Sequence, residues 1–348
     1  MKVTYIFDDS FFDQFLTVTN SILRNEKKEL ADSIEFYISF FGKEESVEPL
    51  LKLSSTYFPN NKFYIKHVPT EFADLCAKYE ESYHLKNSQD HIPSSVLARF
   101  DLDKIWPEIT DRVLYLDLDL IVRGRISELF DLADKDSIIS ACNSNEILAS
   151  ELHSWKPHYS DEEHKKYYDY LSSFRDDLER IYNRQVVHSP HNGHNVDSYE
   201  YILGKEYDLI SPAFNAGVFI LNIAKYKKDS LLRRDIDFLI SLNRFGMFLR
   251  FNDQSILNFV FHDKVDWIDP RWNRLHYGWD KPKYTKKSKE NFPYAKIIHY
   301  NGQYKPWLFN DDCTGLTKSG KKKLFEAENI EYFKPGVALW KEYELCEK

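Results

Sequence analysis

The segment from Arg112 to Val122, RVLYLDLDLIV, constrains the fold more than any other part of the chain. The residues before Asp117 are almost all apolar, which is typical of a strand covered on both faces. Asp117 and Asp119 end this strand, and alternate residues of a strand point to the same face. Because neighbouring carboxylates repel each other, burying them requires a compensating positive charge. Two interpretations follow: a Mg²⁺ or Mn²⁺ site that holds phosphate groups, and a strand that runs into a solvated acidic turn. Because Asp-x-Asp is common by chance, this pattern alone favours the turn.

Strands and helices alternate in the first part of the chain, and Phe12–Leu23 has the apolar spacing of a helix. The predicted strands are Val3–Phe7, Ile34–Ser39, Phe63–Val68, Ser137–Ala141, Val265–Ile268 and Lys296–Tyr300. Alternation of this kind implies parallel strands with helices on both faces, and ligands of such sheets collect at the carboxyl ends of the strands. Asp8 and Asp9 follow the first strand, so we expect them at the same edge as Asp117 and Asp119.

The chain changes character over residues 143–208, which are rich in charged residues, histidine and tyrosine. This stretch indicates an inserted lid or subdomain laid on the sheet. His188, His191 and His194 recur every three residues around Pro190, which is not a helix face, so we interpret them as a His-rich loop rather than a metal site. Core character returns at 213–222.

Composition limits the class of protein. With 348 residues and 43% hydrophobic content, the chain can build one large α/β domain or two small ones. The formal net charge of −8 argues against a general nucleic-acid binder. The four cysteines form no CxxC pair and fit reduced thiols in a cytosolic protein. The N-terminus shows no signal segment, and no apolar run approaches the roughly 20 residues that span a bilayer. We therefore expect a cytoplasmic protein.

Several short motifs follow one another in a fixed order. They are Ala98-Arg99-Phe100, Tyr115-Leu116-Asp117-Leu118-Asp119, Phe214-Asn215-Ala216-Gly217-Val218, Asn252-Asp253-Gln254 with Leu257-Asn258, Trp272-Asn273, and His299-x-x-Gly302-x-x-Lys305-Pro306-Trp307. In this order they resemble glycosyltransferase family eight, which includes glycogenin and the bacterial lipopolysaccharide galactosyl- and glucosyltransferases. The last motif is the most specific, and the resemblance covers roughly residues 1–310 apart from 143–208.

The resemblance implies a GT-A fold, an α/β Rossmann-like fold with a mixed central sheet flanked by helices and, here, a helical insertion. We expect a catalytic domain over 1–310, with 143–208 as an acceptor lid, and a basic and aromatic tail over 311–348. The implied activity is the retaining transfer of a hexose, galactose before glucose, from a UDP-sugar to a glycan hydroxyl. Bacterial surface-polysaccharide, lipopolysaccharide or glycoprotein-glycan synthesis is the expected setting. The tail could rest on the inner face of the cytoplasmic membrane beside a lipid-linked acceptor, or pack as an ordinary helix.

The resemblance also implies site residues. Asp117, Asp119 and His299 would ligate Mn²⁺, with Mg²⁺ as the alternative ion. Asp253 and Gln254 would act on the donor sugar in catalysis. The donor-binding residues implied are Ile6, Asp8, Ser10, Arg99, Leu118, Asn215, Gly302 and Lys305.

Each of these positions has a structural alternative. His299 could be a packed histidine, and Asp253 could serve only as the N-cap of a helix. Arg99 could pair with a nearby carboxylate such as Asp101. The run Asn215–Gly217 could be a strand passage that needs small side chains.

The mechanism also has alternatives. Many family members carry Asp-Gln-Asp where this chain has Asp253-Gln254-Ser255. A serine without a base is a poor nucleophile, which favours front-face attack over a covalent intermediate. Two other functions remain open: a metal-dependent nucleotidyl or phosphoryl transferase, although the chain has no P-loop motif, and a catalytically silent sugar-binding protein.

Overall fold

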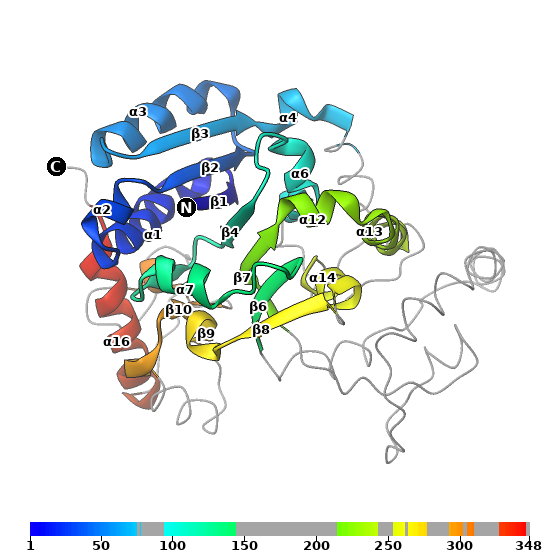
Figure 1. The fold of residues 1–348 in the computed structure, drawn as a ribbon. Coiled ribbons are helices and arrows are strands. Elements are labelled where there is room, and N and C mark those ends of the chain that lie inside the picture. The colour runs from blue at the N-terminus through cyan, green and yellow to red at the C-terminus, as the bar shows by residue number, and fades with distance from the viewer. Residues whose placement is uncertain are drawn as a thin grey trace, which may run out of the picture. The chain divides into compact units, whose positions relative to one another are not determined.

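The computed structural model describes residues 1–74, 77, 94–143, 214–242, 253–261, 264–276, 292–301, 305–309 and 327–345. The chain divides into two compact units (Figure 1). The first unit comprises residues 1–67, 113–133 and 268–348, and the second comprises 68–112 and 134–267. The predicted insertion lies outside the described residues from position 144 on, together with its three histidines. The predicted domain boundary at residue 310 stays a prediction.

The first unit contains a parallel sheet whose strand order is β3-β2-β1-β4. These strands are β1 (Lys2–Phe7), β2 (Glu35–Phe40), β3 (Lys62–His67) and β4 (Arg112–Leu116). Helix α1 (Phe12–Asn25) connects β1 to β2, and α3 (Val47–Tyr57) connects β2 to β3. The parallel alternation predicted from the sequence is therefore confirmed. Since β1 and β4 run side by side in the same direction, Asp8 and Asp117 follow strands that end at the same edge.

Aromatic packing explains why these segments stay together. Phe15 of α1 lies edge-on to Tyr5 of β1, with ring centroids 5.6 Å apart. Phe36 of β2 stacks on Phe63 of β3 at 5.0 Å. Tyr5, Phe15 and Phe36 have no exposed surface. Burial of each large ring contributes roughly 2–3 kcal/mol, so the apolar face of α1 holds it on the sheet.

A smaller sheet completes the first unit. It contains β5 (Leu120–Val122), β9 (Arg274–Leu275) and β10 (Ile297–His299), with β10 in the middle. Strand β10 pairs antiparallel with β5 and parallel with β9. The remaining elements are η1 (Asp9–Phe11), α2 (Lys28–Ala31), η2 (Glu44–Ser46), α7 (Ile126–Leu132), η7 (Pro270–Asn273), η8 (Phe292–Tyr294), η9 (Pro306–Leu308) and α16 (Ala327–Tyr343).

Helix α16 covers most of what the sequence marks as the aromatic tail. Phe333, Trp340 and Tyr343 are all buried, and Figure 1 shows the helix, in red, beside α1. The packed-helix alternative therefore describes this part of the tail. Across the described residues, none of the helices is both long and apolar enough to cross a membrane.

The second unit contains strands in the order β7-β6-β8, with β6 antiparallel to β7. They are β6 (Ile139–Asn143), β7 (Phe214–Asn222) and β8 (Val265–Ile268). The helices of this unit are α4 (Val68–Glu71), η3 (Ser94–Asp101), α6 (Leu102–Ile105), α12 (Ile223–Lys228), α13 (Ser230–Leu242) and α14 (Asp253–Phe261). Every residue of β7 is buried, as its apolar sequence predicts. The described strands thus pair both in parallel and antiparallel, and helices connect them along the chain.

Candidate functional site

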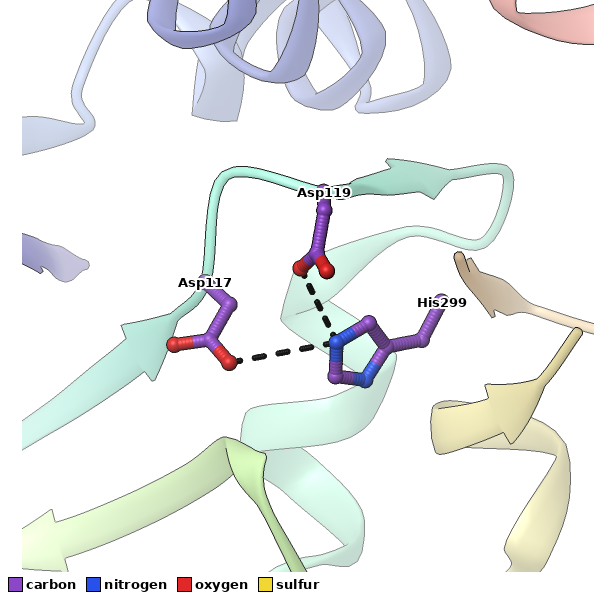
Figure 2. Close-up of side chains that lie close together, drawn as sticks. All are labelled: Asp117, Asp119 and His299. Atoms are coloured by element: carbon purple, nitrogen blue, oxygen red, sulfur yellow. Dashed lines mark ion pairs between the residues drawn. The ribbon is translucent and has the colours of Figure 1, made fainter. Parts of the chain in front are cut away.

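Three side chains of the first unit could hold a divalent cation. Asp117, Asp119 and His299 each offer one ligand atom, and these atoms all lie within 4.8 Å of one another. The Nε2 atom of His299 lies 2.9 Å from Oδ1 of Asp119 and 3.8 Å from Oδ2 of Asp117. Figure 2 shows both carboxylates pointing toward this edge of the imidazole ring. We call these three residues the metal group.

The backbone brings the metal group together in a way that the sequence pattern did not predict. The strand that was expected to end with Asp117 and Asp119 is shorter, because β4 ends at Leu116 and β5 begins at Leu120. Asp117 and Asp119 therefore lie on the turn between two strands, and the alternation of a single strand does not explain their placement. Strand β10 pairs His299 with Leu120, and the backbone N–H of Tyr300 donates to the carbonyl of Asp119 at 2.7 Å. This pairing places the imidazole of His299 beside the two carboxylates.

Asn273 orients His299. Its amide oxygen lies 3.0 Å from Nδ1 of the buried imidazole, so Nδ1 carries the proton and donates to the amide. Nε2 then faces two carboxylate groups. Its lone pair would repel their negative charge, so a proton or a cation is required between Nε2 and the carboxylate oxygens. A histidine held through its other ring nitrogen is typical of metal ligands. The donor set of two carboxylates and one imidazole therefore fits a divalent ion such as Mn²⁺ or Mg²⁺.

Two further side chains support the carboxylates. Nζ of Lys305 contacts Oδ2 of Asp119 and donates to the carbonyl of Tyr300 at 2.9 Å. The hydroxyl of Tyr115 donates to Oδ1 of Asp117 at 2.8 Å. Burial raises the pKa of Asp119, but the charges of Lys305 and His299 outweigh it and hold that pKa well below its usual range. Asp119 is therefore ionised at neutral pH and available as a ligand.

The other donor-binding residues predicted in the first unit are less closely grouped. Ile6 lies half-buried near the end of β1. Asp8 is the N-cap of η1, and its carboxylate accepts hydrogen bonds from the backbone N–H and the hydroxyl of Ser10. Leu118 is buried on the turn between the two aspartates. Gly302 lies outside the described residues. Asp8 therefore has at least a structural role, and its contact with a nucleotide stays a prediction.

A second group of polar side chains is buried within the second unit. Arg99 of η3 forms an ion pair with Asp253 of α14, with 2.7 Å between Nη1 and Oδ2. Arg99 also donates to the backbone carbonyl of Ala216 at 3.1 Å. Asn215 of β7 donates to the amide oxygen of Gln254 at 2.9 Å. We call Arg99, Asn215, Asp253 and Gln254 the polar group.

The alternatives raised for the polar group are partly resolved. Arg99 does pair with a carboxylate, which is Asp253, whereas Asp101 forms ion pairs with Lys104 and Arg233. Helix α14 begins at Asp253 itself, so this residue opens the helix instead of preceding it as an N-cap. The structure thus joins four of the residues that the sequence nominated separately.

Backbone N–H groups determine the orientation of the side-chain amides of Asn215 and Gln254. The N–H of Ala216 donates to Oε1 of Gln254 at 3.2 Å, and the N–H of Gly217 donates to Oδ1 of Asn215 at 3.0 Å. An N–H group can only donate, so each of these side-chain atoms must be the oxygen. The oxygen of Gln254 is therefore engaged by the protein, while its amide nitrogen remains a donor.

Asn258 is a residue whose role the sequence did not reveal. Its amide accepts from the backbone N–H of Phe214 and donates to the carbonyl of the same residue, both at 2.8 Å. It also donates to the carbonyl of Gln254, one helical turn earlier, at 2.8 Å. Asn258 and Asn273 both lie in quoted motifs, but the sequence offered no sign of their partners. Asn258 ties α14 to β7 and so holds Asn215 and Gln254 together.

Comparison with known proteins identifies the family of this chain. The model of the glycosyl transferase family 8 matches residues 2–311. The human glycosyltransferase 8 domain-containing protein 1 is 26% identical over 220 residues, which cover 60% of this chain and 50% of that protein. The chain thus spans about half the length of this relative.

Solved structures show the same fold. The galactosyltransferase LgtC, bound to donor and acceptor sugar analogues, superposes with a TM-score of 0.53 at 18% identity, covering 99% of this chain and 100% of LgtC. Mouse xyloside xylosyltransferase 1 gives a TM-score of 0.53 at 19% identity, covering 86% and 98% of the two chains. These likenesses, with the mixed sheet, establish a GT-A-like fold. Since the family model covers most of the chain, this protein belongs to glycosyltransferase family 8.

Proposed function

We propose that this glycosyltransferase transfers a hexose from a UDP-sugar to a glycan hydroxyl with retention of configuration, using Mn²⁺ held by the metal group. Galactose is the first candidate for the hexose and glucose the second. The observation that carries the proposal is the geometry at His299, whose Nε2 faces two carboxylates at 2.9 and 3.8 Å. LgtC, which has the same fold, is a galactosyltransferase, and this supports galactose.

The metal group and Lys305 would act on the diphosphate. A cation bound there would neutralise the negative charge that develops on the leaving UDP. Asp117, Asp119 and His299 would hold it through two oxygens and one nitrogen. Nζ of Lys305, which contacts Asp119, would supply a second positive charge to a diphosphate oxygen.

The polar group would bind the donor sugar. Arg99 neutralises Asp253 at 2.7 Å, which reduces the nucleophilicity of that carboxylate. The oxygen of Gln254 is engaged by Asn215 and Ala216, so this residue offers its amide N–H to a sugar oxygen. These contacts favour front-face attack. In that step the acceptor oxygen bonds to the anomeric carbon as the bond to phosphate breaks, and the departing phosphate takes the acceptor proton.

The acceptor is proposed from the family resemblance. A surface polysaccharide, lipopolysaccharide or glycoprotein glycan presents a hydroxyl of the kind required. A cytoplasmic location beside the membrane stays a prediction, as does the contribution of residues 143–208 to acceptor binding.

A panel of UDP-sugars would test the donor and the metal together. We expect UDP release from UDP-galactose or UDP-glucose with Mn²⁺, and its loss with EDTA or in Asp119→Asn. Asp136→Asn is the matched control, because this aspartate of the second unit has a side chain that is 93% exposed. Release of UMP or pyrophosphate instead of UDP would indicate a nucleotidyl or phosphoryl transferase. Binding without turnover would indicate a silent sugar-binding protein, and a glycosyl adduct on the intact enzyme would overturn front-face attack.

A further inference from the structure

We propose that the C-terminal helix α16 positions the metal group through Tyr300, so that it determines metal affinity as well as stability. The inference rests on the proposed metal role of Asp117, Asp119 and His299. Helix α16 comprises Ala327–Tyr343 and lies beyond residue 311, where the match to the family model ends. The helix thus lies outside the region that the family model matches, and its contacts give it a defined task.

The backbone of Tyr300 connects the residues of the site. It follows His299 directly, and its N–H donates to the carbonyl of Asp119 at 2.7 Å. Its carbonyl accepts a hydrogen bond from Nζ of Lys305 at 2.9 Å. A shift of the Tyr300 backbone would thus move two predicted metal ligands and the predicted diphosphate-binding lysine at once.

The side chain of Tyr300 is held by α16. Its hydroxyl donates to the backbone carbonyl of Gly336 at 2.7 Å, inside the protein. Its ring lies edge-on to Trp340, with centroids 5.7 Å apart and an interplanar angle of 84°. Both side chains are at most 2% exposed. Leaving the buried hydroxyl of Tyr300 without an acceptor would destabilise the folded protein. The hydrogen bond therefore fixes Tyr300 relative to the helix.

The close approach of the helix requires glycine at position 336. A Cβ atom there would lie 2.9 Å from Nε2 of His276 and 3.0 Å from Cε1 of Tyr300. Both neighbours are rings buried in the core, so neither can move aside cheaply. The space beside Gly336 therefore determines how near α16 comes to Tyr300.

The far end of α16 is attached to the helix that also supports β5. Asn20 of α1 donates to the carbonyl of Tyr343 at 2.7 Å. Asn25 donates both to the hydroxyl of Tyr343 at 2.8 Å and to the carbonyl of Val122, the last residue of β5, at 2.9 Å. Because β5 pairs with β10, the same helix α1 locates α16 and the strand pair that carries the metal group.

A third contact lies on the other side of Lys305. Trp307 of η9 packs against Trp340 of α16, with ring centroids 4.8 Å apart. Helix α16 thus contacts Tyr300 before Lys305 and Trp307 after it. Trp340 makes both contacts, with Tyr300 and with Trp307. An element that positions Lys305 and the metal ligands is expected to contact the chain on both sides of the lysine.

Two substitutions in the full-length protein test the proposal. Tyr300→Phe removes only the hydroxyl, and Gly336→Ala adds one methyl group at the point of closest approach. The matched control is Tyr5→Phe, which removes a buried hydroxyl that contacts Thr19 in the same unit. The readouts are the Kd of Mn²⁺ in the presence of UDP, from the paramagnetic resonance signal of the free ion, and the thermal midpoint.

We expect both test variants to bind Mn²⁺ about three- to tenfold more weakly, which is the transmitted effect of one lost hydrogen bond or a small shift. The control should lose thermal stability while its Kd stays within about twofold of wild type. Equal Kd values in Tyr300→Phe and wild type, with only the thermal midpoint lowered, would overturn the inference and leave α16 a purely structural helix. If Gly336→Ala does not fold, Tyr300→Phe decides alone. Failure of the wild-type protein to bind Mn²⁺ would refute the proposed function instead.

Discussion

The ion pair between Arg99 and Asp253 gives the sharpest prediction about the polar group. Their charged atoms are 2.7 Å apart, and the side chains are only 6% and 9% exposed. Two unit charges about 4 Å apart attract by about 4 kcal/mol at an effective dielectric constant of 20, before the cost of desolvation is subtracted. Removing one partner of a buried pair typically costs about 3–5 kcal/mol, because the other charge stays buried.

The test is a double-mutant cycle with Arg99→Met, Asp253→Asn and the double variant. We expect Arg99→Met to lower the free energy of unfolding by about 3–5 kcal/mol, since it leaves the Asp253 carboxylate without that compensating charge. In the double variant neither member of this pair is left as a charge facing a neutral partner, so it should be less destabilised than the sum of the single variants by about 1–3 kcal/mol. Urea unfolding followed by tryptophan fluorescence measures all three.

The pair between Arg271 and Asp269 is the control for this cycle. Its atoms are as close, at 2.6 Å, but the side chains are 56% and 36% exposed. Solvent screens such a pair, so we expect little coupling between Arg271→Met and Asp269→Asn. Additive effects at Arg99 and Asp253 would refute the argument that burial makes this pair important.

The same cycle separates a structural role from a role in donor binding. If Arg99 and Asp253 contact the donor sugar, the double variant should recover stability without recovering transfer. A double variant that retains wild-type transfer would show that the pair is only structural.

Three further predictions concern stability and metal dependence. Asp229 caps α13 and pairs with Lys264 at 2.6 Å; burial raises its pKa, but Lys264 and the backbone N–H of Leu232 lower it further. Asp229→Asn should therefore cost about 1 kcal/mol at neutral pH. The difference should shrink as the pH falls below about 4, where the unfolded carboxylate becomes protonated, and disappear once the pH falls through the lowered pKa of the native carboxylate. A constant difference in urea unfolding from pH 7 to about pH 3 would contradict this. Asn258→Ala leaves the buried N–H and carbonyl of Phe214 without that partner, so the free energy of unfolding should fall by about 2–4 kcal/mol. An unchanged free energy of unfolding would show that these hydrogen bonds do not hold α14 to β7. Removal of divalent ions with EDTA should abolish transfer and lower the thermal midpoint in the presence of UDP, and Mn²⁺ should restore both; undiminished transfer in EDTA would exclude the metal role.

The chemical identity of the site could be predicted from the sequence. Asp117, Asp119 and His299 are ligand types suited to a divalent cation, and the structure brings them together. The parallel strand–helix alternation also followed from local apolar patterns, because burial on both faces of a strand produces a continuous apolar run. The order of the motifs was sufficient to identify the family.

The means of assembly depended on tertiary structure. The sequence predicted one strand through Asp119, but the chain turns after Leu116, and the imidazole arrives through the pairing of β10 with β5. Asn273, Asn258 and Gly336 contribute through contacts with residues far away in the chain, and a one-dimensional pattern does not specify which partner a buried amide or carbonyl meets. Ligand chemistry is a property of residue type and therefore local. The orientation of those ligands depends on strand register and side-chain packing, which only the folded chain determines.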